Sequence, residues 1–207
     1  MADSYYDAVV LAGGSARRLD GVDKPALPLG GLGGTTLLDR VVAACTEARS
    51  VVCVGPERPT GRPVHWTRED PPGSGPVAAL AAGLALTRAP YVAVLAADLP
   101  FLTADVVHTL WTNAADHDGA VLTDEQGKDQ WLAACYRRSA LTEAIARYDS
   151  VAGLSLKRLL AGFDLTRVPD TEGSAFDCDT WDDVAHVRGL VDGSGGDHRP
   201  PRTESEH

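Results

Sequence analysis

The chain has 207 residues, of which 44% are hydrophobic, and a formal net charge of -10. This length suits one substantial domain, and no apolar run approaches the roughly 20 residues that a membrane span needs. The acidic balance argues against nucleic acid or an anionic membrane as the main partner, although a local cluster of cations can still serve a small phosphorylated ligand. The first residues, MADSYYD, lack a secretory signal pattern, so we expect a cytoplasmic protein.

Strand and helix patterns alternate along the chain. Pro76 suits a first helical turn, Thr103 a helix N-cap, and Thr180 with Asp183 a capping box. The patterns predict strands at residues 6–11, 50–55, 63–67, 91–96, 119–123 and 130–136, and helices at residues 35–49, 76–88, 103–115, 138–148 and 180–191.

This alternation predicts an α/β fold, a three-layer α/β/α sandwich with a mostly parallel sheet. The strand at 91–96 is continuously apolar, as expected of a strand buried on both faces. Residues 1–191 are expected to form one domain. Residues 192–207 are polar and rich in Gly and Pro, so we expect a disordered tail there.

The cysteines and histidines show no metal pattern. Cys45, Cys53, Cys135 and Cys178 are far apart, without a C-x-x-C pair, and no histidines show H-x-x-x-H spacing. We interpret the cysteines as small buried hydrophobic residues in a reducing compartment rather than zinc ligands or disulfides.

The most informative stretch is LAGGSARRLDGVDKPALPLGG, at residues 11–31. It follows the first strand, where ligands of open α/β sheets bind. Glycines let backbone N–H groups approach an anion closely, and Arg17, Arg18 and Lys24 add positive charge. The pattern is neither G-x-G-x-x-G nor G-x-x-x-x-G-K-[ST]. It predicts a loop that binds nucleotide phosphates. The later run GGLGG, at residues 30–34, is read as a hairpin-like linker without chemistry.

Asp98 lies just after the end of the apolar strand at 91–96 and precedes Leu99 and Pro100. A carboxylate at the mouth of a buried strand is costly unless it is solvated or paired. One interpretation is a Mg²⁺ ligand, since Mg²⁺ prefers hard oxygen donors. The other is a cap for the next helix, a role that Thr103 fills better. We favour the metal.

These motifs resemble those of the nucleotidyltransferases related to the molybdenum cofactor guanylyltransferases. The stretch at 11–24 matches the family pattern L-A-G-G-x-x-x-R-[ML]-G-G-x-D-K except at Asp20. REDPPGSGPVAAL (68–80), LAADLPFL (95–102) and FDCDTWDDVA (176–185) resemble three further family motifs in the same order. The resemblance covers the chain from about residue 6 to residue 191.

The resemblance implies a fold of the nucleotidyltransferase type and transfer of GMP from GTP to molybdopterin, with Mg²⁺ as cofactor. GTP and molybdopterin, with or without molybdenum, would be the small-molecule partners of a monomer or weak homo-oligomer. The implied catalytic residues are Lys24, Arg18 and Asp98. The implied nucleotide-binding residues are Leu11, Ala12, Gly13, Gly14, Lys24, Asp70, Gly75, Pro76 and Asp98. Lys24 would contact the phosphates that are cleaved, in a loop that we expect to be exposed.

Two segments depart from the family pattern. Asp177 and Asp179 stand where the family usually has asparagine. An aspartate only accepts hydrogen bonds and adds charge, so the pair, Asp179 in particular, either provides a further metal ligand or caps the last helix. Gln130 and Trp131 occupy a segment that borders the second substrate in the family. Trp131 there is more typical of a core residue.

Two alternatives remain. The first keeps the reaction class but transfers CMP, or uses a phosphorylated small acid or sugar phosphate as acceptor. The second is a nucleotide-binding sensor without catalysis, against which the presence of both Lys24 and Asp98 argues.

Overall fold

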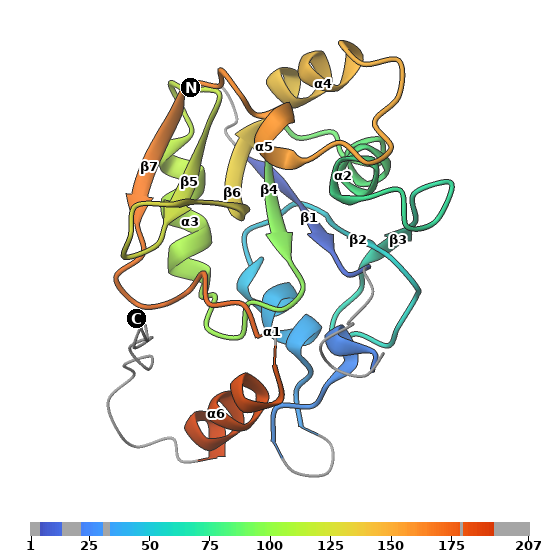
Figure 1. Cartoon of the computed structure of the whole chain (residues 1–207). Helices are drawn as coiled ribbons and strands as arrows, with labels where there is room; N and C mark the ends of the chain where they lie inside the picture. The colour runs from blue at the N-terminus through green and yellow to red at the C-terminus, as the bar shows by residue number, and fades with distance from the viewer. Residues whose placement is uncertain (1–4, 14–21, 31–33, 179, 193–207) are drawn as a thin grey trace, which may run out of the picture.

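A seven-stranded sheet forms the centre of the molecule (Figure 1). The computed structural model describes residues 5–13, 22–30, 34–178 and 180–192. The strands are β1 (Tyr6–Leu11), β2 (Val51–Val54), β3 (His65–Thr67), β4 (Tyr91–Ala96), β5 (Gly119–Thr123), β6 (Asp129–Arg137) and β7 (Leu165–Pro169). Their order is β3-β2-β1-β4-β6-β5-β7. β6 runs antiparallel to β4 and β5, and the other neighbouring pairs are parallel.

Helices cover both faces of this sheet, which gives the three layers expected from the sequence. The helices are α1 (Leu37–Ala44), α2 (Pro76–Leu84), α3 (Ala104–Asn113), α4 (Arg138–Ala146), α5 (Leu156–Leu159) and α6 (Trp181–Asp192), with a short 3-10 turn, η2 (Lys24–Ala26). One face carries α1 and α3, and the other carries α2, α4 and α5. No helix among the described residues is long and apolar enough to cross a membrane.

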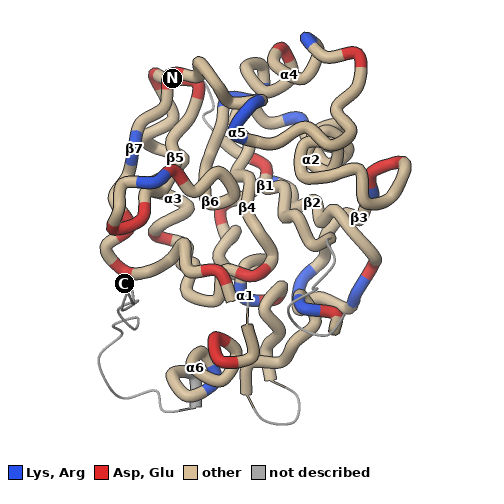
Figure 2. Tube along the Cα trace, in the orientation of Figure 1, with Lys and Arg blue, Asp and Glu red and all other residues tan. Residues whose placement is uncertain are grey.

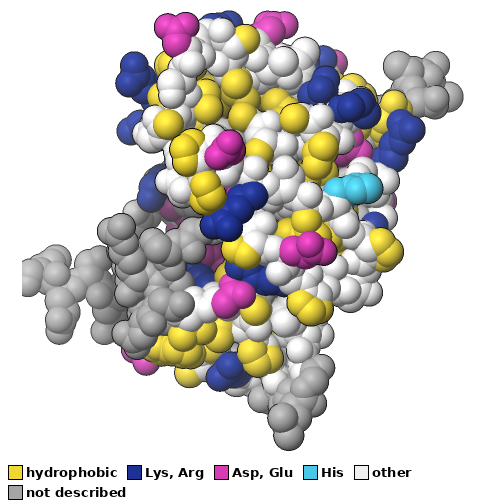
Figure 3. All heavy atoms as spheres, turned by 90° about the vertical axis from the view of Figure 1, so that its right-hand side faces the viewer, with side chains coloured by type: hydrophobic (Ala, Val, Ile, Leu, Met, Phe, Trp, Pro, Cys, Tyr) yellow, Lys and Arg dark blue, Asp and Glu magenta, His cyan; other side chains and the backbone are white. Residues whose placement is uncertain are grey.

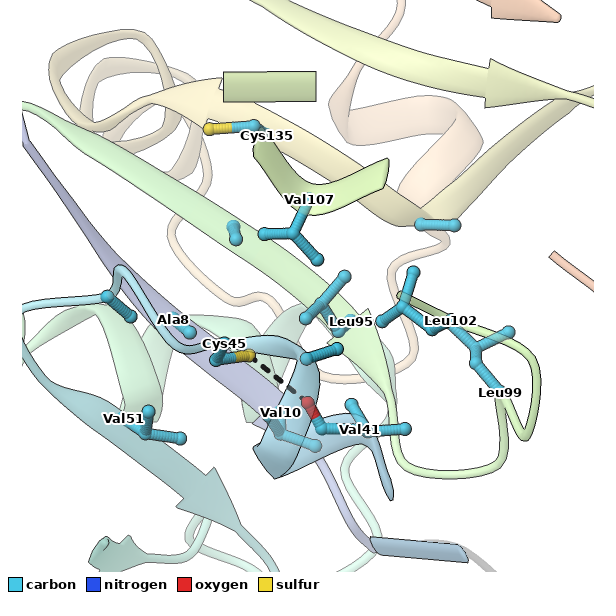
Figure 4. Close-up of a cluster of buried hydrophobic side chains, with 14 of the residues drawn as sticks. Ala8, Val10, Val41, Cys45, Val51, Leu95, Leu99, Leu102, Val107 and Cys135 are labelled. Carbon is cyan, nitrogen blue, oxygen red and sulfur yellow. Dashed lines mark hydrogen bonds between the residues drawn. The ribbon is translucent and has the colours of Figure 1, made fainter. Parts of the chain in front are cut away.

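The central strands are apolar on both faces because both faces are covered. Successive residues of a strand point to opposite sides of a sheet. Ala8 and Val10 of β1 therefore belong to the core beneath α1 and α3, whereas Val9 belongs to the core beneath α2. Figure 4 shows Ala8 and Val10 in the first of these cores, together with Val41 of α1 and Val107 of α3. Because both faces of these strands are apolar, polar and charged side chains are accommodated at the strand ends.

Several local expectations are confirmed, and some boundaries differ. The side chain of Thr103 accepts a hydrogen bond from the N–H of Val106 at 3.3 Å, as a cap for α3. Thr180 and Asp183 form the expected capping box of α6. The helix expected at 35–49 spans only 37–44, and the helix expected at 76–88 ends at residue 84. The helix α5 and the strand β7 were not predicted from the sequence.

The four cysteines are buried, as predicted. Cys45 donates a hydrogen bond from its Sγ to the carbonyl of Val41, at 3.3 Å (Figure 4). Burial raises the pKa of the Cys45 and Cys53 thiols to about 12. They act as small apolar residues of the core.

The C-terminal helix α6 lies apart from the two helical layers and packs against the segment that follows η2. Val184 and Val187 share a small apolar cluster with Leu29. The guanidinium Nε of Arg188 donates to the carbonyl of Pro28 at 3.0 Å. An isolated antiparallel bridge joins Pro28 to Thr36, consistent with the hairpin-like linker expected there, although residues 31–33 lie outside the described residues.

Candidate active site

A cleft of about 780 Å³ opens at the carboxyl ends of β1 and β4. The chain reverses its direction of winding between these strands, because β2 follows on one side of β1 and β4 on the other. Ligands of open α/β sheets bind at such a point. The lining residues are Leu11, Gly13, Gly55, Pro56, Arg58, Arg68, Glu69, Pro72, Gly73, Gly75, Pro76, Ala79, Ala96, Asp98, Leu132 and Asp177.

Basic and acidic side chains meet in this region. Figure 2 shows Lys and Arg positions gathered near the carboxyl end of β2, close to Asp and Glu positions. Figure 3, which views the molecule from the right of Figure 1, shows basic and acidic side chains close together at mid-height, among apolar ones. Arg58 and Arg68 line the cleft together with Glu69, Asp98 and Asp177, so the described lining carries charges of both signs.

The floor of the cleft is backbone, made by the loop after β1 and the end of β2. The N–H of Ala12 donates to the carbonyl of Val54 at 2.8 Å, which carries the sheet pairing one residue beyond the strand. Gly55 has a φ of 150°. A Cβ at Gly55 would lie 2.8 Å from the carbonyl carbon and oxygen of Ala12, so only glycine permits this approach. Gly13 follows, exposed and facing the cleft.

Lys24 and Asp98 meet at the edge of this cleft. The ammonium of Lys24 donates to Oδ2 of Asp98. The side chains retain only 12% and 22% of their possible exposure, so Lys24 is not as exposed as the sequence led us to expect. Pro25 stands at the start of η2 and fixes the backbone of that turn. Two residues 74 positions apart in sequence, each expected to be catalytic, are thus in direct contact.

Arg58, which was not among the residues predicted from the sequence, lies between the loops of the site. Its Nε and Nη2 donate to the carboxylate of Asp23 at 2.6–2.8 Å. Its Nη1 donates to the carbonyls of Ala12 and Pro56 at 3.0 and 2.8 Å. The only sequence signal was an arginine shortly after a buried strand, which is too common a pattern to indicate a role.

The loop after β3 forms another wall. Glu69 lines the cleft, and its Oε1 accepts a hydrogen bond from the N–H of Gly73 at 2.8 Å. Gly75 caps α2 with a φ of 101°, and Pro76 begins that helix, so the positive end of the α2 dipole faces the cleft. Asp70 is exposed and lies between the lining residues Glu69 and Pro72. Its contact with a nucleotide stays a prediction.

The segment before α6 closes the site from the C-terminal side. The N–H of Cys178 donates to the carbonyl of Asp98 at 3.2 Å, which places Asp177 in the lining of the same cleft. Thr180 supplies the cap of α6. Asp179, the other residue of the capping alternative, lies outside the described residues.

A second cavity of about 210 Å³ shares Leu132 and Asp177 with the main cleft. Gln130 and Trp131 line it. Gln130 donates through Nε2 to Oδ2 of Asp124 at 2.8 Å, and Trp131 is half-buried.

Of the residues that the sequence analysis assigned to the site, Leu11, Gly13, Gly75, Pro76 and Asp98 line the main cleft. Ala12 is buried beneath it. Gly14, Arg17, Arg18 and Asp179 lie outside the described residues.

The carboxylates of the cleft are chemically suited to a hard divalent cation. Asp98 and Asp177 line the same cleft, and carboxylate oxygens are donors that Mg²⁺ prefers. Within the described part of the chain, no three His, Cys, Asp or Glu side chains cluster as a preformed metal site. Mg²⁺ typically binds through one or two carboxylates together with substrate phosphates, so a larger cluster is not required.

Comparison with known proteins adds to this geometry. Residues 8–168 match the family model of the MobA-like NTP transferase domain. The chain is 35% identical over 163 residues to a probable molybdenum cofactor guanylyltransferase of Mycobacterium bovis (strain BCG / Pasteur 1173P2), an alignment that covers 75% of this chain and 78% of the relative.

Solved structures share the fold at lower identity. The molybdopterin-guanine dinucleotide biosynthesis protein A of Archaeoglobus fulgidus has a TM-score of 0.70 at 20% identity, over 90% of this chain and 99% of that one. The 2-C-methyl-D-erythritol 4-phosphate cytidylyltransferase of Thermus thermophilus also has a TM-score of 0.70, at 21% identity, over 91% and 99% of the two chains.

Proposed function

The chain belongs to the MobA-like NTP transferase family, and on this premise we propose that it transfers GMP from GTP to the phosphate of molybdopterin and releases pyrophosphate. The guanylyltransferase name of the relatives at 33–35% identity supports GTP and molybdopterin as the substrates. The cytidylyltransferase is similar at only 21% identity, which indicates a shared fold.

One observation of the structure carries the proposal: the contact between Lys24 and Asp98 at the edge of a cleft that opens at the switch point of the sheet. A cation and a carboxylate in one place are what nucleotidyl transfer requires. The phosphates need positive charge as the bond to pyrophosphate breaks, and the nucleotide needs a fixed position.

In this mechanism the protein orients the reactants. The acceptor phosphate attacks the α-phosphorus of GTP in line; a new P–O bond forms, and the P–O bond to pyrophosphate breaks. No covalent bond to the protein is needed. The exposed backbone of Gly13 and the N-terminus of α2 form the walls that hold the nucleotide. Lys24, leaving its contact with Asp98, neutralises charge on the departing phosphates.

We propose Mg²⁺ as the cofactor, with Asp98 as its main protein ligand and Asp177 or Asp179 as further candidates. When bound, Mg²⁺ would neutralise charge on the triphosphate and fix its geometry. Arg18 is proposed as a further cation at the phosphates, from the family motif.

The decisive experiment is a screen of nucleotides and acceptors. Purified protein is incubated with each of the four NTPs, with and without molybdopterin, and pyrophosphate release and dinucleotide product are measured. We expect both products with GTP and molybdopterin together. If CTP were the one nucleotide that gave product, the protein would be a cytidylyltransferase and not a guanylyltransferase. Tight GTP binding without product for any acceptor would identify a sensor.

A further inference from the structure

The guanidinium of Arg58 connects three segments that are separate in sequence. It donates to the carboxylate of Asp23, to the carbonyl of Ala12 and to the carbonyl of Pro56, at distances from 2.6 to 3.0 Å. Its side chain keeps only 11% of its possible exposure. Arg58 also lines the cleft itself.

Each of these contacts holds a part of the site. Asp23 is the N-cap residue of η2 and directly precedes Lys24, but its side chain makes no hydrogen bond to that turn as a cap. Its carboxylate turns to Arg58 instead. Ala12 lies in the loop after β1 and precedes Gly13. The guanidinium therefore spans the gap between the lysine turn and the floor of the cleft.

We propose that Arg58 is a positioning residue that sets the place of Lys24 relative to the nucleotide loop. The inference rests on the proposed function, because it assigns the purpose of the contact to nucleotidyl transfer. Arginine suits this position because its planar head presents five N–H donors in a fixed arrangement, and here they reach a carboxylate and two carbonyls at once. A lysine has three donors on a single nitrogen and cannot span the same acceptors.

The contact differs from an ordinary surface ion pair. An exposed pair contributes little to stability, and Asp23 alone would fit that description, since its side chain is 51% exposed. The largely buried guanidinium and its two backbone carbonyls do not fit it. These carbonyls belong to the two loops that form the floor of the cleft, so loss of Arg58 would loosen the loops that must stay in register for transfer.

The test measures steady-state kinetics of the wild type and of Arg58→Ala, Arg58→Lys and Lys24→Ala, and the double variant Arg58→Ala/Lys24→Ala. We expect Arg58→Ala to lower kcat by about 10–100-fold, the scale for misplacing a catalytic group by about 1 Å. The KM for GTP should change less than kcat. Arg58→Lys should recover only a small part of the loss.

The double variant separates positioning from structural support. If Arg58 acts through Lys24, then Arg58→Ala should change the residual rate by less than about 3-fold once Lys24 is absent, because residues that act as a unit are not additive. A purely structural role would lower the rate by the same factor in both backgrounds.

Arg137 provides a matched control. Its guanidinium also bonds to backbone carbonyls, those of Ala115 and His117, but at the other end of the sheet, where β6 pairs with the start of β4. Arg137→Ala should lower the melting temperature and leave the activity of the folded protein unchanged.

The outcomes are distinct. Wild type that is inactive with every nucleotide and acceptor would refute the proposed function itself. If the wild type is active, three results would each overturn the assignment of Arg58 and leave the proposed function intact. These are an unchanged kcat in Arg58→Ala, full activity in Arg58→Lys, and additive losses in the double variant.

Discussion

Replacement of Gly13 by alanine tests how the site chooses its base. Gly13 is exposed and lines the cleft. It follows Ala12, whose N–H donates to the carbonyl of Val54 and whose carbonyl accepts from Arg58. A Cβ at Gly13 would lie 3.7 Å from the carbonyl oxygen of Val54 and 3.8 Å from the Cα of Gly55. Both are ordinary van der Waals distances, so the added methyl group needs no rearrangement of the fold. Its effect falls on the space available to the ligand.

The expected size of that effect follows from the volume of one methyl group. In the proposed function a purine lies against the backbone of this loop, and a pyrimidine needs less of the same space. One methyl group in a binding pocket changes discrimination by about 1–3 kcal/mol. Gly13→Ala should therefore lower kcat/KM for GTP by tens of fold and lower kcat/KM for CTP by a smaller factor. The melting temperature should stay close to that of the wild type.

The assay measures kcat/KM for GTP and CTP on wild type and variant, with molybdopterin as acceptor, alongside thermal unfolding of both proteins. Wild type should prefer GTP. A wild type that prefers CTP, or a variant that loses activity with both nucleotides by the same factor, would refute the reasoning. A large drop in melting temperature would show instead that the loop cannot accept a Cβ, contrary to the distances at Gly13.

The remaining predictions concern the charges, the floor of the cleft and the thiols. Asp98→Asn should abolish Mg²⁺-dependent turnover and keep the fold; a near-normal rate in Mg²⁺ would contradict the metal assignment. Lys24→Ala should lower kcat by roughly 10²–10³-fold, and preserved activity per folded molecule would make Lys24 structural. Gly55→Ala should destabilise the protein by about 1–3 kcal/mol, because its Cβ would meet the backbone of Ala12; an unchanged melting temperature would argue against that packing. The pKa of Cys53 is raised to about 12, so at pH 8 only about one thiol in 10⁴ is ionised; rapid alkylation of the native protein, read by mass spectrometry, would show that the thiol is not buried.

The sequence predicted the layers of the fold because their signals are local. Continuous apolar runs identify strands covered on both faces, and helical periodicity with caps such as Thr103 identifies the helices between them. The boundaries were less accurate. The apolar pattern of α1 continues to Ala48, which is buried, although the helix has already ended at Ala44. Apolar residues thus stay buried beyond the end of the hydrogen-bonded helix, and the apolar pattern alone predicted too long a helix.

Two elements were missed because their signals are weak. The helix α5 has only four residues, too few for a periodic pattern. The strand β7 is an edge strand of five residues, LTRVP, that ends in proline. Proline is tolerated at the edges and ends of sheets, so Pro169 is compatible with this strand but gives no positive signal for it. The pairing with β5 fixes this strand, and pairing between distant segments has no local signature.

Site residues that directly follow a buried strand could be predicted from the sequence. A residue that joins segments distant in sequence could not. Gly13 and Asp98 follow buried strands, so their position at the cleft could be inferred from the sequence. The role of Arg58 could not, because two of its partners, Asp23 and Ala12, are 35 and 46 residues away in sequence. Only the arrangement of loops brings them together.

The contact of Lys24 with Asp98 explains how two charged side chains can be largely buried in the free protein. A charge taken from water is costly unless it is paired, and these side chains are only 12% and 22% exposed. In the free protein each offsets the other's charge, so the site is kept formed without a nucleotide. The two removals are therefore not equivalent. Lys24→Ala withdraws the ammonium from a carboxylate that keeps its charge, whereas Asp98→Asn leaves an isosteric amide with an oxygen that still accepts from Lys24. Lys24→Ala should thus lower the melting temperature more than Asp98→Asn, even though both suppress turnover. The reverse order in thermal unfolding would mean that the pairing does not hold the free site together.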